Sequence, residues 1–125
     1  MNLESLFIPS IDPKSTRPES LAYLGDLVLK MIFLKKILNE TSKAPELHKD
    51  SVFHNNRVYQ SNVLEKILDL LTEDERWIVR RAKNSKSANK FGNDKNYKNA
   101  TGLEALIGYL FIKKDFDRII FLLEI

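Results

Sequence analysis

Two segments far apart in the chain each place one carboxylate beside a glycine in an apolar stretch. Residues 21–26 read LAYLGD and end on Asp26, while residues 101–108 read TGLEALIG and contain Glu104. A carboxylate among core residues is costly unless a cation or a hydrogen-bond donor compensates its charge. Because glycine lets two helix backbones approach closely, the two acids could meet at a helix crossing. Two carboxylates at one crossing would suit a divalent cation, and hence metal-assisted hydrolysis.

Each acid also has a simpler interpretation. Asp26 stands four residues before Lys30, so these two residues could form an ordinary ion pair on one helix. Glu104 could face solvent at the edge of an apolar stripe. A shared site is favoured because both acids recur near glycines, on the two most core-like helices that the sequence predicts.

Basic residues precede the second acid. The stretch over residues 80–98 is rich in Lys, Arg and Asn, and only Asp94 opposes its charge. Such a run is often a solvated loop, but cations that flank a metal site would neutralise the phosphates of a phosphodiester substrate. The candidate RNA-binding residues of this stretch are Arg80, Arg81, Lys83, Asn84, Lys86 and Lys98.

A weaker polar cluster lies upstream of this basic stretch. It begins with His48, and Asn56, Arg57 and Gln60 follow at spacings that put them on one helix face. This face either is simply exposed to solvent or contacts the backbone or minor groove of double-stranded RNA. His48, Arg57 and Gln60 are therefore further candidate RNA-binding residues.

Composition limits the classes of fold and site. The chain has 125 residues, 43% of them apolar, which is enough for one globular domain with a core. It has no cysteine and only two histidines, so disulfides and zinc sites built from Cys or several His are excluded. We expect a soluble intracellular protein with no membrane partner, because no apolar stretch has the length of a membrane span and the N-terminus does not resemble a secretory signal.

Hydrophobic periodicity predicts an all-α protein. Residues 1–15 are expected to form an N-terminal tail, and residues 16–125 a single folded domain. The first long helix is apolar nearly all round, which predicts that it is the central, buried one. Thr72 and Glu75 fit a capping box, and Asp115 fits the cap of the last helix. Helices are predicted over residues 16–38, 45–49, 52–71, 73–82, 100–113 and 116–123, with a mobile loop over residues 83–98.

The two acidic segments, in this order and spacing, resemble the catalytic domain of ribonuclease III. The likeness is closer to mini-ribonuclease III, the short form without a separate double-stranded-RNA-binding domain, and a diverged plastid-encoded member would fit. Further matching positions include residues 47–49, Gln60, residues 81–86 and residues 97–98, and the resemblance covers residues 19–123. It implies a ribonuclease III-like all-α endonuclease domain folded as a single compact helical bundle, a homodimer, Mg²⁺ dependence and cleavage of double-stranded RNA. For the short form it implies maturation of a 23S ribosomal RNA precursor.

On this resemblance, Asp26 and Glu104 match the metal-binding catalytic acids of the family. Ala22 and Thr101 stand where the longer enzymes carry two more acids, and Lys30 stands where the short form usually has an acid. The chain would then be a Mg²⁺-dependent endoribonuclease, with a ribosomal protein as a helper. The alternatives are an RNA-binding or ribosome-assembly factor that kept the dimeric fold but lost turnover, and a purely structural helical module. The expected compartment is the cytoplasm of a bacterium, or the chloroplast stroma if an organelle encodes the chain.

Overall fold

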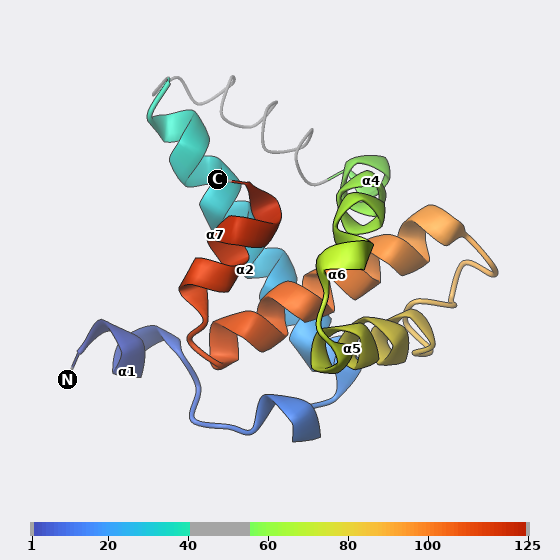
Figure 1. The fold of residues 1–125 in the computed structure, drawn as a ribbon, viewed down its shortest axis with the longest axis horizontal. Helices are drawn as coiled ribbons and strands as arrows, with labels where there is room; N and C mark the ends of the chain where they lie inside the picture. Colours follow the sequence, from blue (N-terminus) through green and yellow to red (C-terminus); the bar gives the residue numbers. More distant parts are fainter. Residues whose placement is uncertain (1, 41–55, 125) are drawn as a thin grey trace.

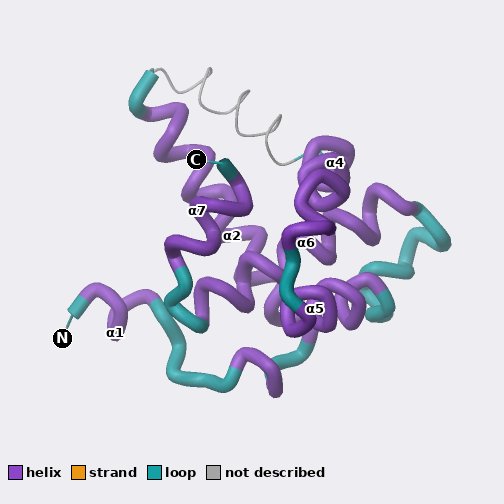
Figure 2. Tube along the Cα trace, in the orientation of Figure 1, coloured by secondary structure: helices purple, strands orange, loops and turns teal. Residues whose placement is uncertain are grey.

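A computed structural model describes residues 2–40 and 56–124 of the chain. Within these two ranges all regular structure is helical, as predicted, and Figure 2 shows helices joined by loops. None of the helices there has the length and hydrophobicity that crossing a membrane requires. The elements are α1 (Leu3–Phe7), the 3-10 helix η1 (Pro13–Ser15), α2 (Pro18–Leu38), α4 (Arg57–Ile67), the 3-10 helix η2 (Leu68–Leu70), α5 (Glu73–Lys83), α6 (Lys95–Ile112) and α7 (Phe116–Leu123).

Helix α6 forms the centre of the fold, and α2, α4 and α5 pack against it (Figure 1). From Asn99 to Ile112, only Glu104 and Phe111 keep partial exposure. The prediction that residues 16–38 form the central buried helix is therefore wrong. Helix α2 buries one face against α6 and exposes apolar side chains on another, including Tyr23 and Met31. A helix that exposes apolar side chains to solvent or to a partner has the same high apolar content in the sequence as a buried helix.

Caps fix the ends of the shorter helices. Thr72 and Glu75 form the predicted capping box at the start of α5, with hydrogen bonds of 2.8 and 3.2 Å. Glu75 is buried, and its carboxylate accepts two hydrogen bonds from the guanidinium of Arg118 on α7, at 2.7 and 2.9 Å. Burial acts to raise the pKa of Glu75, but Arg118 and Thr72 outweigh burial and leave that pKa below its usual value. This contact ties the start of α5 to α7.

Helix α6 begins five residues earlier than the predicted position 100, because Asp94 caps it. The Oδ1 of Asp94 accepts a hydrogen bond of 3.1 Å from the backbone N–H of Tyr97. The connection from α5 to α6 therefore spans residues 84–94. Its backbone is held by side chains: Asn89 Nδ2 donates to the carbonyl oxygens of Lys83 and Ser85 at 3.0 and 2.9 Å.

The predicted ends of α2, α5 and α7 agree with the structure to within two residues, but the helix predicted over residues 52–71 does not run through residue 56, because Asn56 has an extended backbone. Asp115 caps α7, as expected. Asn56 caps α4, which ends at Ile67 and continues as η2. The short helix predicted over residues 45–49 lies outside the described residues. Residues 2–15, predicted as a tail, include α1 and η1, and they contact the domain through ion pairs from Glu4 to Lys114 (3.2 Å) and from Lys14 to Asp74 (2.9 Å).

Candidate active site

Helices α2 and α6 cross at Gly25 and Gly108. A Cβ atom on Gly25 would overlap the backbone carbonyl of Glu104, and one on Gly108 would overlap the backbone carbonyl of Leu21. Only glycine therefore allows the two backbones to lie this close. The crossing brings Asp26 and Glu104 within hydrogen-bonding contact of each other, as the sequence predicted.

The two carboxyl groups cannot both be ionised at low cost in this setting. The pKa of Glu104 is raised from 4.5 to about 8, first by burial, then by the hydrogen bond to Asp26 and by the charge of Asp26. The cations Lys30 and Arg57 act in the opposite direction but do not outweigh these effects. Near neutral pH, and without an added cation, the pair therefore holds a proton.

Lys30 also makes a direct contact with the acidic pair. Its Nζ lies 3.1 Å from Asp26 Oδ2, one helical turn further along α2. The simple ion pair that the sequence offered as an alternative is thus present. It coexists with the contact between Asp26 and Glu104.

The donor set at the crossing fits a hard divalent cation. It consists of two carboxylates, and the described residues contain no group of three or more His, Cys, Asp or Glu that could hold a metal. Ala22 and Thr101, which lie four and three residues before the two acids in the sequence, are buried and add no carboxylate. Mg²⁺ typically binds through one or two carboxylates and keeps several waters, whereas zinc needs three or four protein ligands. The residues present therefore fit Mg²⁺.

An aromatic and cationic cluster stands beside the acids. The guanidinium of Arg57, at the start of α4, lies 4.4 Å from the ring centre of Tyr97 and 5.0 Å from that of Phe91. The two rings pack edge to face at 4.8 Å, and Lys90 Nζ lies 5.1 Å from the Phe91 ring centre. These contacts fasten the 84–94 connection to α4 and leave a positive charge near Glu104. Phe91 was not among the residues predicted to be functional, because the sequence shows it only as one of two aromatic residues in a polar stretch.

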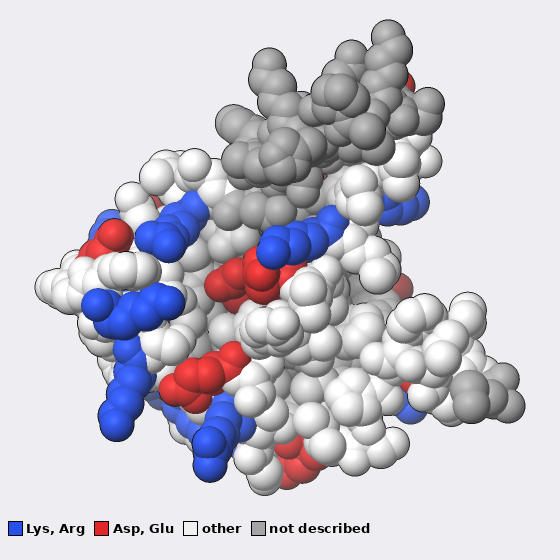
Figure 3. Space-filling view, turned by 180° about the vertical axis from the view of Figure 1, so that it is seen from behind, with Lys and Arg blue, Asp and Glu red and all other residues white. Residues whose placement is uncertain are grey.

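The other candidate RNA-binding residues are spread over the surface. Arg80, Asn84 and Lys86 are exposed, and their side chains form no hydrogen bond or ion pair with the described residues. Lys98 donates a hydrogen bond of 3.1 Å to Asn93. Arg81 stacks on Trp77 at 4.5 Å and donates to the carbonyl of Lys14, and half-buried Lys83 packs near Gly102. On the face shown in Figure 3, basic and acidic side chains lie next to each other rather than in one positive patch. His48 lies outside the described residues.

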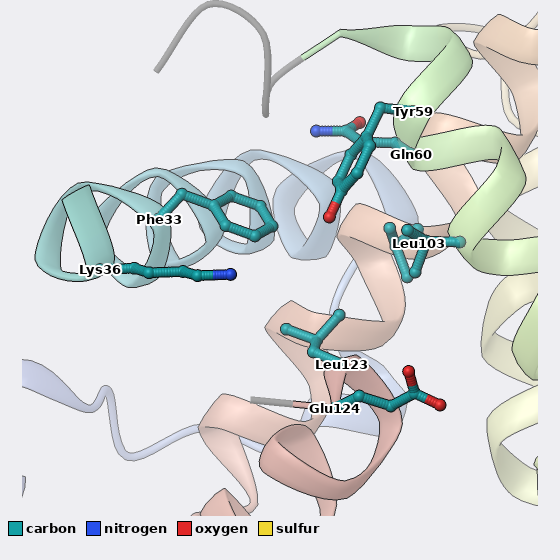
Figure 4. A pocket seen from close by; sticks show the side chains of 8 residues that line it. Phe33, Lys36, Tyr59, Gln60, Leu103, Leu123 and Glu124 are labelled. Carbon is teal, nitrogen blue, oxygen red and sulfur yellow. The ribbon is translucent and has the colours of Figure 1, made fainter. Parts of the chain in front are cut away.

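Gln60 is not on the exposed face that its spacing from Arg57 suggested. Its side chain is 2% exposed and lines a cavity of about 220 Å³ together with Phe33, Lys36 and Leu103 (Figure 4). Its Nε2 is buried and has no hydrogen-bond partner among the described residues. Arg57 is exposed, as expected, so the predicted polar face divides between surface and interior.

Comparisons with known proteins identify the family and the fold of the chain. The family model for the ribonuclease III domain matches residues 19–115. A Mini-ribonuclease 3 of Kosmotoga olearia is 40% identical over 98% of this chain and 86% of its own length. One from Thermoanaerobacter is 37% identical over 89% and 80%. A Fusobacterium nucleatum protein of known crystal structure is 32% identical, with a TM-score of 0.81, over 92% of this chain and 94% of that one.

Proposed function

This chain belongs to the ribonuclease III family, and from that premise we propose that it cleaves double-stranded RNA at a Mg²⁺ site formed by Asp26 and Glu104. Membership of the family makes the chain an endoribonuclease of the ribonuclease III type. Members of this family generally depend on a divalent metal and act on double-stranded RNA as dimers. In this proposal residues 16–125 form the catalytic domain, and residues 1–15 an N-terminal extension.

The observation that carries the proposal is the crossing of α2 and α6. Two glycines allow this close approach, and it places two carboxyl groups in contact where one of them must keep a proton. A divalent cation would replace that proton and remove the repulsion between the carboxylates. Placing the two carboxyl groups together therefore costs folding free energy, and a bound cation would offset that cost.

Different residues of the chain would bind the metal ion and the phosphates of the RNA. The chemistry that Mg²⁺ supplies when bound is activation of a water and stabilisation of charge on the scissile phosphate. Asp26 and Glu104 would hold the ion and fix its position relative to the RNA. Arg57, held by Tyr97 and Phe91, would neutralise a phosphate next to the cleaved bond. Exposed basic residues on α5 and on the 84–94 connection, such as Arg80 and Lys86, would contact the backbone further along the duplex.

We propose that the homodimer forms through the exposed apolar face of α2. Tyr23, Leu27 and Met31 recur at every fourth residue of this face and are 73%, 49% and 66% exposed. An apolar stripe of this kind on a soluble protein marks an interaction surface. Because Asp26 lies on the same helix, a two-fold dimer through this face would bring two active sites close to one interface, one for each strand.

The finer assignments rest on the likeness to mini-ribonuclease III. We propose a 23S ribosomal RNA precursor as the substrate, and a ribosomal protein as a helper. The relatives include a cyanobacterial protein, from Synechococcus, at 31% identity. The proposed compartment is the bacterial cytoplasm, or the plastid stroma if the gene is organellar.

A cleavage assay on matched RNA substrates tests the function. The full chain is incubated with Mg²⁺ and a labelled 23S stem, and in parallel with one strand of that stem alone. We expect cleavage of the duplex only. Asp26→Asn and Glu104→Gln should each lower the rate by about 100-fold or more, with RNA affinity nearly unchanged. Tight binding without cleavage under any divalent metal would instead show that the chain is a non-catalytic RNA-binding factor.

A further inference from the structure

We propose that Lys30 is a built-in counter-ion of the acidic pair, which a divalent metal must displace from Asp26, so that Lys30 sets the metal concentration the protein requires. This inference rests on the proposed function in one respect, that Asp26 and Glu104 hold the metal. It adds a residue that opposes metal binding.

The position of Lys30 gives the first argument. Its ammonium lies 3.1 Å from Asp26 Oδ2, on the carboxylate that would hold the metal ion. The Asp26 side chain is 32% exposed, and among the described ion pairs only Glu75 is a more buried acid, at 6%. The pair between Lys66 and Glu124 has the same 3.1 Å separation, but its side chains are 69% and 68% exposed. The contact of Lys30 with Asp26 is therefore less screened by water than an ordinary surface pair.

The charge balance at the crossing gives the second argument. Two carboxyl groups meet there, and among the described residues Lys30 is the one cation in direct contact with either of them. Arg57 acts from further away, and its guanidinium is held over Tyr97 and Phe91. Lys30 thus compensates part of the charge that a divalent ion would compensate completely.

The freedom of Lys30 to leave gives the third argument. Its side chain is 49% exposed, and its ion pair with Asp26 is the one polar contact that the described part of the chain gives it. A lysine ammonium on a flexible four-carbon stem can rotate into water without breaking the packing of α2. Metal binding and the Lys30 contact are therefore competing states of the same carboxylate.

Competition of this kind lowers the affinity for the metal. In bulk water a unit charge opposes a divalent cation by about 2 kcal/mol at about 4 Å, and still by about 1 kcal/mol once the lysine has moved to about twice that distance. The smallest expected effect of removing Lys30 is then about fivefold in the dissociation constant for the metal, which corresponds to about 1 kcal/mol. A stronger effect is expected if the site excludes water.

Direct metal titration separates the possibilities. Mn²⁺ is titrated into the full chain, and the free ion is followed by electron paramagnetic resonance, for the wild type, Lys30→Gln and Lys30→Arg. Lys66→Gln is the matched control, since it removes one lysine and one 3.1 Å ion pair away from the acids. Circular dichroism checks that each variant is folded. We expect Lys30→Gln to bind Mn²⁺ at least about fivefold more tightly than the wild type, and the other two variants to bind within about twofold of it. The Mg²⁺ concentration for half-maximal RNA cleavage should fall in parallel for Lys30→Gln.

Two results would overturn the inference. One rejects only the role of Lys30, and the other also rejects the proposed metal site. If the wild type and Lys66→Gln bind Mn²⁺ but Lys30→Gln binds it no more tightly, Lys30 does not compete and the proposed function stands. If none of the proteins binds Mn²⁺, both the metal site and the role of Lys30 are rejected.

Discussion

At Glu104 the fold retains a proton that a glutamate in water would release. The pKa of about 8 follows from burial beside Asp26, in a helix whose neighbouring residues are almost all buried. Asp26 contacts both Glu104 and the ammonium of Lys30. The metal-free site therefore stores unfavourable electrostatics that the unfolded chain does not have.

This proton predicts an unusual pH dependence for the metal-free protein. Since the folded pKa of Glu104 lies above its unfolded value of 4.5, the folded state binds more protons between these two values. The free energy of unfolding should thus fall as the pH rises from 5 towards 9. Glu104→Gln should remove this fall and be more stable than the wild type at pH 9, by roughly 2–4 kcal/mol. Urea unfolding in the presence of EDTA measures the effect.

The control for this experiment is Glu65→Gln. Glu65 is an exposed acid paired with Lys95 at 2.6 Å, so the variant removes a carboxylate without touching the crossing. It should leave the pH profile of the wild type unchanged. A Glu104→Gln variant that also retains the fall in stability towards pH 9 would mean that the proton is not held at Glu104.

Residue by residue, the sequence revealed the acids better than their surroundings. A carboxylate beside a glycine in an apolar helix is a local pattern, and it correctly predicted that Asp26 and Glu104 meet. The stacking of Arg57 on Tyr97 and Phe91 joins different elements and has no periodic signal. The burial of Gln60 was missed because the spacing of polar residues indicates which of them share a helix face. It does not indicate whether part of that face is packed against other helices.

At the scale of elements, the crossing of α2 and α6 is the feature on which the site depends. Gly25→Ala or Gly108→Ala would place a methyl group on the backbone of the facing helix, which cannot move aside as a side chain can. Each variant should lose at least about 3 kcal/mol of stability and separate the two acids. Denaturant unfolding and Mn²⁺ binding report the two effects independently.

Gly102→Ala is the matched control on the same helix. A Cβ there would meet side-chain atoms of Val79 and Lys83 at 3.1 and 3.2 Å, and these atoms can shift. We expect a change in stability within about 1 kcal/mol, and normal metal binding. Equal losses for Gly25→Ala and Gly102→Ala would contradict a special role for the crossing.

Most helices could be predicted from the sequence because local signals specify them. The capping box at Thr72 and the cap at Asp115 correctly marked two helix starts. The start of α6 was placed too late because the polar residues 95–99 resemble a loop, while Asp94 supplies the cap. Which helix is central depends on tertiary packing, and the apolar content of α2 alone could not reveal that α6 is enclosed by its neighbours.

For the whole molecule, the apolar face of α2 predicts the oligomeric state. Leu27→Glu should convert the proposed homodimer to a monomer, because a carboxylate would be buried at the two-fold interface. Leu70→Glu is the control, since Leu70 on η2 is 51% exposed and Leu27 is 49% exposed. Light scattering coupled to gel filtration, at tens of micromolar protein, should show a dimer for the wild type and for Leu70→Glu. A dimer that persists in Leu27→Glu would place the interface elsewhere.

The central claim is that Asp26 and Glu104 bind one and the same ion, and a double-mutant cycle on Mn²⁺ affinity tests it most directly. The wild type should bind one ion per chain, and Asp26→Asn and Glu104→Gln should each weaken binding strongly. Combining both substitutions should add little to either single loss, because the remaining carboxylate alone cannot hold the ion. Independent, additive losses, or a wild-type affinity in either single variant, would show that the two acids do not share a cation.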